Sequence, residues 1–562
     1  MNLYVMNKLK LIIIASVVLV SCQKKLDEFI VNPNGPDLSN ASVDLLLNNV
    51  QLNFVGFYGT ANDFGGQLTR QQQWYGPLYN NGYSPSSFDG MWSNAYTGIM
   101  KNANKLIEIA DGEKKYFAIG IAQVIKAYTL GTLVDYFGDV PYSQAVLGIE
   151  NQNPEVDASA DLYTTVFALL DSAISNFQKT SAASPQNDLF YNGSKANWIK
   201  AAKTLKLKFY TQIRLVDNSV SSKISALLTE NDLINTTAQD FEFKFGTNIN
   251  SPDSRHPHYA ANYRSQRSAT EFIGNHFMWA VIAEKSGGVV TATDPRRRYY
   301  FYRQQTNYAN VNVQTCSCAF ENVPGHYPSV PDQGTFCLPG AGYWGRDHGD
   351  NSGIPPDGQL RTTWGIYPAG GQMDQSQGAA VNLEVGGRGA GIHPIWESFF
   401  TSFLEAEISL KLGIATAGTP RALLEKGVRG SITKVLGFPA TIGVTVDPSF
   451  VPSQSAIDSY VGIVLNDYDN AADDDERMEV IMKEYYLALW GNGVESYNNY
   501  RRTGKPSNLQ PVKSSATPGF FPRSQYYPFV FVNRNFNAPA QKDIGQAPNK
   551  VFWDNNPDNF VK

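Results

Sequence analysis

The chain is short of cysteine and of basic residues, and it lacks the short motifs that identify several large enzyme classes. It has 4 Cys, and its 46 Lys and Arg stand against 51 Asp and Glu, for a net charge of −5 at pH 7. A surface of that sign does not attract phosphate backbones, so nucleic acid is not expected as a partner. The sequence contains no His-Glu-x-x-His, Gly-x-Ser-x-Gly or Gly-x-x-x-x-Gly-Lys-Ser/Thr. These absences argue against a zinc peptidase, an α/β-hydrolase and a P-loop NTPase.

The N-terminus carries a targeting signal. Lys8 and Lys10 precede an apolar run from Leu11 to Val20, and Ser21-Cys22 follows. A run of about ten residues is too short to span a bilayer, which needs about twenty. The pattern predicts a lipoprotein signal peptide over 1–21, with a covalent lipid on Cys22 after cleavage and a flexible leader over 22–40. An ordinary signal peptide that happens to contain a cysteine is the alternative.

The other cysteines lie close together, at Cys316, Cys318 and Cys337. Outside the cytoplasm these residues can form a disulfide between Cys337 and either Cys316 or Cys318. A zinc site with His326 as fourth ligand has suitable residue types but irregular spacing. The stretch 347–353 offers oxygen ligands for calcium but departs from the EF-hand register, so a turn is expected there. We therefore expect no metal and no cofactor apart from the lipid.

The rest of the chain is expected to form a single domain over 41–562. Its pattern is helical over 41–240, rich in loops with short strands over 241–394, helical again over 395–505, and loop-like over 506–562. Helical period is seen in two apolar sets, which are Trp396, Phe399, Phe400, Phe403 and Leu404, and Met478, Ile481, Met482, Tyr485, Tyr486 and Leu489. This indicates a mainly α fold of tetratricopeptide-like helix pairs carrying a large, partly β insertion.

Single segments give sharper expectations. Ile119 to Phe137 is apolar nearly all round, which is typical of a helix packed between other helices. Thr419-Pro420 should open a helix through a capping hydroxyl and a proline at the first helical position. The acidic run Asp473 to Glu476 should begin another, because negative charge stabilises a helix N-terminus.

Aromatic residues are abundant, with 30 Tyr, 31 Phe and 9 Trp. Flat rings beside amide and guanidinium donors suit a ligand with apolar faces and polar edges, such as a sugar or an extended peptide. Core packing is the alternative for each ring. The predicted ligand-binding residues form a first cluster of Trp74, Tyr75, Tyr79 and Tyr83 and a second cluster of Tyr343, Trp344, Arg346, Trp364 and Tyr367.

The segment Leu133 to Ala145 reads Leu-Val-Asp-Tyr-Phe-Gly-Asp-Val-Pro-Tyr-Ser-Gln-Ala. It resembles the D-x-x-G-D-V-P-Y-s-x-A segment of SusD/RagB-like outer-membrane lipoproteins. Pro141 should keep the chain out of the helix, and Asp135 and Asp139 should cap or pair around a turn at Gly138. The residues that carry the motif, and for which we expect a structural role, are Asp135, Gly138, Asp139, Pro141 and Tyr142. Further matching stretches, in family order, are Trp92–Ile107, Leu170–Ile174, Trp198–Leu207, Asp294–Arg296, Phe403–Glu407 and Glu484–Gly504.

The resemblance is to the second SusD-like subgroup and covers nearly the whole mature chain. It implies about four tetratricopeptide-like helix pairs with an irregular ligand-binding part. It further implies a lipid-anchored, surface-facing outer-membrane protein that captures an oligosaccharide or peptide and acts as the lid of a SusC-like TonB-dependent barrel. Such proteins are not enzymes. The alternatives are a surface glycosidase or peptidase, motivated by acids such as Glu405 and Glu407, and a non-transport adhesin.

Overall fold

The computed structural model describes residues 42–264, 271–286, 293–306, 322–328, 336, 342–350 and 360–562. The lipidation site Cys22, the signal peptide and leader, and the cysteines Cys316, Cys318 and Cys337 lie outside the described residues. The predictions made for them therefore remain predictions.

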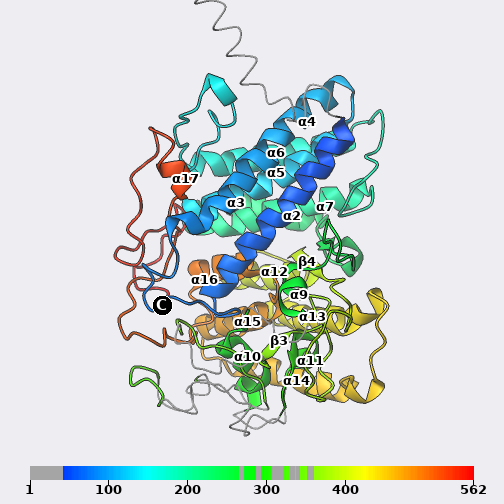
Figure 1. The fold of residues 1–562 in the computed structure, drawn as a ribbon, viewed down its shortest axis with the longest axis vertical. Helices are drawn as coiled ribbons and strands as arrows, with labels where there is room; N and C mark the ends of the chain where they lie inside the picture. The colour runs from blue at the N-terminus through cyan, green and yellow to red at the C-terminus, as the bar shows by residue number, and fades with distance from the viewer. Residues whose placement is uncertain are drawn as a thin grey trace, which may run out of the picture.

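The first part of the chain forms a layer of packed helices, drawn in blue and cyan in the upper half of Figure 1. Helix α2 begins after Ser42, whose side chain accepts a hydrogen bond from the Leu45 amide, and it buries one face against the helices that follow. The elements of this layer are α2 (Val43–Leu68), η2 (Pro85–Phe88), α3 (Asp89–Ser93), η3 (Asn94–Met100), α4 (Lys101–Gly112), α5 (Tyr116–Phe137), η4 (Gly148–Glu150), α6 (Ser159–Gln178), α7 (Lys195–Gln212), η5 (Ile213–Leu215), α8 (Val220–Glu230) and η6 (Thr237–Gln239).

Helix α5 is the core helix that the sequence predicts. It packs against α4 and α6, and nearly all its residues are buried. Among the described residues it is the helix long and apolar enough to cross a membrane, but 94% of that apolar stretch is buried inside the protein. Its apolar composition is therefore explained by helix packing on all sides.

A second helical layer lies below the first in Figure 1. As predicted, Thr419 caps α13 by accepting a hydrogen bond from the Ala422 amide, and Asp473 caps α15. The helix predicted from Trp396 starts later, because Trp396 belongs to a strand and Ser398 is the first helical residue. The elements are α12 (Ser398–Leu412), α13 (Pro420–Thr441), η10 (Pro448–Phe450), α14 (Gln454–Asn470), α15 (Asp474–Ala488) and α16 (Gly493–Thr503).

The loop-rich part, which separates the two helical blocks in the sequence, contains two small antiparallel sheets, β1 with β4 and β2 with β3. In the first sheet Phe241 pairs with Trp396, which joins the end of the first helical block to the start of the second. The elements are β1 (Phe241–Lys244), α9 (Pro257–Asn262), α10 (Asn275–Ile282), η7 (Glu284–Ser286), α11 (Arg297–Tyr300), β2 (Phe301–Arg303), β3 (Thr362–Trp364) and β4 (Ile392–Trp396). After α16 the chain is mostly loop, with the short helix α17 (Phe529–Val532). The predicted mainly α fold with a partly β insertion is confirmed.

Helix α16 returns to pack on α2 at a contact between backbones. A Cβ atom on Gly493 would lie 2.1 Å from the Asn62 carbonyl oxygen, and one on Gly65 would lie 2.1 Å from the Gly493 carbonyl oxygen. Only glycine fits at such a distance. The crossing therefore fixes the last long helix of the fold directly against the first.

The motif segment forms a buried hub. Asp135 is fully buried, and its carboxylate accepts hydrogen bonds from the Tyr163 hydroxyl at 2.5 Å, the Asn498 amide at 2.8 Å and the Trp553 indole at 2.9 Å. Helix α5 ends at Phe137 because Gly138 has φ +74°. Three donors from three parts of the chain thus meet at one carboxylate.

Asp139 contacts the start of α6 and not the Gly138 turn for which the sequence predicts it. It does not pair around the Gly138 turn, since its carboxylate accepts hydrogen bonds from the amide and hydroxyl of Ser159, the first residue of α6. The Pro141 carbonyl accepts from the Tyr96 hydroxyl at 2.7 Å, and the Tyr142 amide donates to Asp157 at 2.7 Å. The contacts of Asp139, Pro141 and Tyr142 therefore hold the loop from α5 to α6 rather than one turn.

Candidate functional site

A cleft of about 880 Å³ lies between the loop 507–521 and the loop that follows α2. We call it the C-terminal cleft. Its lining is mostly apolar and includes Leu509, Val512, Phe520 and Val561. No carboxylate side chain is found among the described residues that line it. The described part of its lining is therefore apolar and offers no pair of acids of the kind that a glycosidase uses.

Arg70 holds the wall of the C-terminal cleft in place. Its guanidinium is buried and donates to the carbonyl oxygens of Gln510 at 3.0 Å, Leu68 at 2.7 Å and Lys562 at 2.9 Å. It also donates to the Tyr79 hydroxyl at 3.2 Å. Because these bonds come from one rigid guanidinium, they fix loops that are more than 400 residues apart in sequence.

The first predicted cluster is largely buried. Trp74 is 0% and Tyr79 is 2% exposed, whereas Tyr75 is 51% exposed. The Tyr83 ring is half-buried against Phe64 and Phe88. Tyr79 lines the C-terminal cleft, and burial raises the pKa of its phenol although Arg70 opposes the shift. Tyr79 is thus the member of this cluster that lines the cleft, and Tyr75 is the member whose side chain is half exposed.

The second predicted cluster is divided between two places, and all of it is buried. Tyr343, Trp344 and Arg346 are 1%, 4% and 8% exposed, and Tyr343 donates a hydrogen bond to Asp374 at 3.0 Å. Trp364 lies in a separate stack, 3.9 Å from the ring of His258 on one side and 3.9 Å from that of Trp490 on the other. Tyr367 packs on Phe438. The alternative reading, core packing of a loop-rich region, therefore describes these rings in this structure.

The structure does bring the first cluster to the segment that follows Arg346. The Trp74 ring stacks on His348 at 5.0 Å, and the Trp74 carbonyl accepts from the Gly349 amide at 2.9 Å. Burial is the first cause that holds the pKa of His348 well below its usual range, with Arg70 the next. His348 is thus neutral and takes part in packing.

Sequence reasoning missed most of the cleft. Phe520 and Phe521 lie in a stretch with Pro518 and Gly519, which the sequence marks only as loop. Their neighbours in space, such as Arg70, are distant in the chain. No local signal links them, because the cleft is created by long-range contacts of loops.

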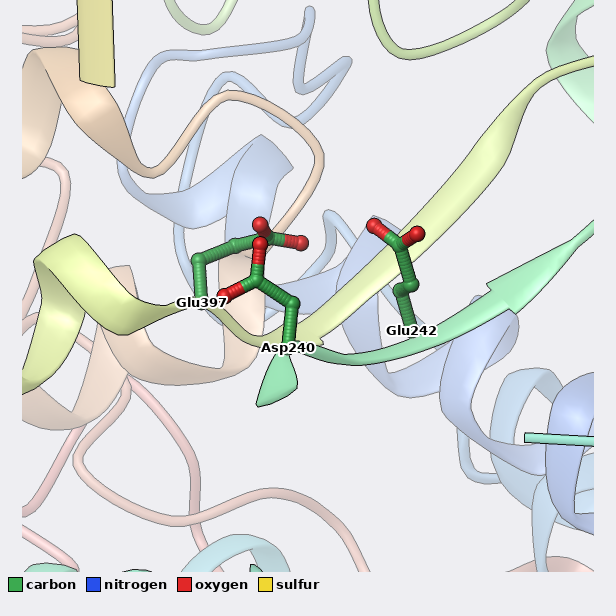
Figure 2. A group of neighbouring side chains, drawn as sticks. All are labelled: Asp240, Glu242 and Glu397. Carbon is green, nitrogen blue, oxygen red and sulfur yellow. The ribbon is translucent and has the colours of Figure 1, made fainter. Parts of the chain in front are cut away.

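The second candidate site is an acid cluster formed by Asp240, Glu242 and Glu397, whose ligand oxygens all lie within 4.8 Å of one another. Figure 2 shows Asp240 and Glu242 projecting to the same side of the chain at β1, with the Glu397 carboxylate beside that of Asp240. The Lys434 ammonium is 2.9 Å from Asp240, 2.7 Å from Glu242 and 3.1 Å from Glu397. Burial, followed by Asp240, holds the pKa of Glu397 well above its usual range. These are the described residues with the donor set of a metal site.

Glu405 and Glu407 do not form an acid/base pair. Glu407 is buried and binds Arg502 through both of its carboxylate oxygens, at 2.8 and 2.7 Å, and Arg214 at 2.9 Å. Glu405 instead accepts from the Ala417 amide at 3.2 Å. Each acid has its own structural partners, so the motivation for a hydrolase fails at these residues.

Two family models match this chain. The model described as "Starch-binding associating with outer membrane" matches residues 35–321, and the model described as "Susd and RagB outer membrane lipoprotein" matches residues 397–547. The chain belongs to the SusD-like family. The predicted family is confirmed, and with it an outer-membrane location. No curated protein matches the chain.

Solved structures share the fold of this SusD-like protein. A SusD/RagB family protein from Bacteroides thetaiotaomicron superposes with a TM-score of 0.65 at 17% identity, covering 92% of this chain and 100% of the other. A chitin-binding protein gives 0.62 at 20% identity, with coverage of 92% and 100%. A chitin-binding SusD homologue from Flavobacterium johnsoniae gives 0.59 at 16%, with coverage of 91% and 99%. These likenesses establish the tetratricopeptide-like helical fold.

Proposed function

We propose that this protein is a cell-surface lipoprotein, anchored through Cys22, that binds an oligosaccharide or peptide without chemical turnover. It then delivers the ligand to a SusC-like TonB-dependent barrel. The observation that carries the proposal is the family match over 35–321, whose description names both starch binding and the outer membrane. Two similar structures are named as chitin-binding, which favours a glycan over a peptide.

The C-terminal cleft is the binding site we propose. Its volume of about 880 Å³ is within the range of ligand sites, and apolar side chains dominate its lining. Phe520 is a partly exposed ring in that lining, so it can stack on a sugar face or an apolar side chain. Tyr79 and the backbone of 515–519 supply polar groups at the edge.

The test is binding of the purified mature protein to a glycan and peptide panel, with product analysis of each mixture. We expect binding without products. The Phe520→Ala variant should weaken binding by about fivefold to more than a hundredfold, because loss of one stacked ring removes about 1 to 3 kcal/mol. Phe536→Ala is the matched control, since Phe536 is 96% exposed and does not line the cleft.

Three outcomes would contradict the proposal. Release of products would support a glycosidase or peptidase. Unchanged ligand affinity in Phe520→Ala would show that the ligand binds outside the C-terminal cleft. Failure to co-purify any barrel protein from outer membranes would contradict delivery of the ligand to a SusC-like barrel, although ligand binding itself could still hold.

A further inference from the structure

Three helix ends bring basic side chains to one pocket of about 500 Å³. Arg214 lies in η5, which continues α7, whereas Lys411 and Arg502 lie in the last turns of α12 and α16. A cation at the end of a helix is stabilised by the helix dipole, so each residue suits its own helix. We call this cavity the basic pocket. Its lining includes Arg214, Lys411, Arg502, Lys505, Met478 and Phe560.

One carboxylate serves two guanidinium groups at the basic pocket. Arg502 binds both oxygens of Glu407, at 2.8 and 2.7 Å, whereas Arg214 binds one of them at 2.9 Å. The Arg214 side chain is 7% exposed, and its Nη1 atom has no hydrogen-bond partner among the described residues. Burial lowers the pKa of Arg214 to about 10, with Glu407 opposing that shift and Arg502 adding to it. A buried donor without a partner is costly, so Arg214 would gain from a further acceptor.

The lysines of the basic pocket are also short of acidic partners. Lys505 binds Asp475 at 2.7 Å and Glu479 at 3.4 Å. Lys411 reaches only the same Asp475, at 4.0 Å. Together with the two arginines and Glu407, four cations share three carboxylates in this part of the described structure. This local excess of positive charge stands in a chain whose net charge is −5, and it favours an anionic ligand.

The remaining groups of the basic pocket suit a sugar that carries a carboxylate. Phe560 offers a partly exposed ring, and Thr503 and Ser507 bring hydroxyl groups to the lining. A ring can lie against the apolar face of a sugar, while the hydroxyl groups can meet its polar edge. Arginine binds carboxylates especially well, because its planar guanidinium matches their geometry. The volume of the pocket is within the range of small-ligand sites.

The basic pocket lies next to the C-terminal cleft. Ser507 lines both cavities. At the end of the chain, Phe560 lines the pocket, whereas Val561 and Lys562 line the cleft. The two cavities therefore share a wall, and a charged site stands beside the apolar one.

We propose that the basic pocket binds the carboxylate of a uronic acid through Arg214, with Lys411 and Lys505 supplying supporting charge. The ligand class of this protein is then an acidic oligosaccharide. The choice of a sugar rests on the proposed function, whereas the choice of an anion rests on the charges and the unpartnered Arg214 atom.

Calorimetric titration of the purified mature protein with glucuronate, glucose and acetate tests the pocket. We expect glucuronate to bind. Glucose, which has the same ring without the carboxylate, should bind about tenfold more weakly or worse, as for the loss of a hydrogen bond to a charged group. Acetate, which has the carboxylate without the ring, should also bind about tenfold more weakly or worse, because it loses the contacts of the sugar.

Variants assign the bound carboxylate to the pocket. Arg214→Met should weaken glucuronate binding about tenfold or more. If that variant does not fold, Lys411→Met is the second, since its side chain is 32% exposed, and it should weaken binding about threefold. Asp475→Asn should tighten binding about threefold, because it removes an acid from the pocket, and a misfolded protein cannot give that result. Lys426→Met, at an exposed position on α13, is the control and should equal wild type.

Two results would overturn the inference. If glucose or acetate binds as tightly as glucuronate, the pocket does not recognise a uronic acid. If Arg214→Met and Lys411→Met both leave the affinity for glucuronate unchanged, the carboxylate binds elsewhere.

The outcome for the basic pocket can be separated from that for the proposed function. Binding of neutral glycans from the panel without binding of glucuronate would overturn the acidic ligand and leave the proposed function standing. Binding of glucuronate that depends on Arg214, with unchanged glycan affinity in Phe520→Ala, would contradict the C-terminal cleft and support the basic pocket.

Discussion

Replacing Trp74 with alanine should unfold the protein more easily and should not act as a selective binding mutation. The ring is 0% exposed and lies 4.9 Å from Tyr79 and 5.0 Å from His348. Two glycines close around it, because a Cβ atom on Gly76 or Gly82 would come within 2.3 or 2.0 Å of the ring. With neighbours this tight, the cavity left by alanine cannot collapse readily.

We expect Trp74→Ala to lower the free energy of unfolding by about 3 to 5 kcal/mol, the usual cost of removing a buried aromatic ring. Trp74→Phe should cost about half as much, because it keeps part of the ring and removes an indole NH that has no hydrogen-bond partner among the described residues. Tyr75→Ala is the control, with a cost below about 1 kcal/mol, since half of that side chain is exposed.

Urea denaturation followed by tryptophan fluorescence and far-UV circular dichroism measures these differences. A Trp74→Ala protein within about 1 kcal/mol of wild type that has lost ligand binding would refute the reasoning. Trp74 would then be a ligand contact, as the sequence alone predicts.

Three further predictions concern buried polar and backbone contacts. Asp135→Ala should cost about 3 to 5 kcal/mol in urea denaturation, because it leaves three buried donors unpaired, whereas Asp171→Ala at an exposed ion pair should cost under about 1 kcal/mol. Equal losses of unfolding free energy in Asp135→Ala and Asp171→Ala would contradict the structural role of the Asp135 hydrogen bonds. Gly493→Ala should destabilise strongly or prevent folding, since its Cβ meets backbone at 2.1 Å, and Gly462→Ala, with open space inside α14, should stabilise by about 0.5 to 1 kcal/mol. Burial opposes the charge of His258, but Glu271 and Asp63 outweigh it and raise its pKa to about 10. The stability that charged His258 contributes through these ion pairs is therefore complete below about pH 6.5, and it is lost as pH rises toward 10. The stability difference between wild type and His258→Gln should accordingly shrink from pH 6.5 to pH 10 in thermal melts, and a difference independent of pH would count against the ion pairs.

Local patterns predicted the helical elements well. The cap at Thr419, the acidic start of α15 and the apolar helix α5 follow from side-chain chemistry within a few residues. The predicted start of α12 was wrong because a long-range contact overrides the local pattern there. Trp396 has the helical spacing, yet pairing with Phe241, far away in sequence, makes it part of a strand.

The site was less predictable for a related reason. Aromatic clusters in the sequence do not reveal whether a ring faces solvent, and Trp364 is enclosed by His258 and Trp490, which come from distant segments. The acid cluster was invisible because Glu397 meets Asp240 only through the strand register. In both cases long-range packing, and not residue type, decides which groups are accessible.

The hub at Asp135 has a consequence for the order of folding. Its carboxylate bonds to partners 363 and 418 residues further along the chain, so α5 cannot satisfy its buried charge until nearly the whole polypeptide is present. Contacts of such separation slow folding, because a long loop must close before they contribute. Incomplete chains would therefore keep an open, unsatisfied core, and assembly would finish in a late step, when the segment around Trp553 docks and completes the hydrogen bonding of Asp135.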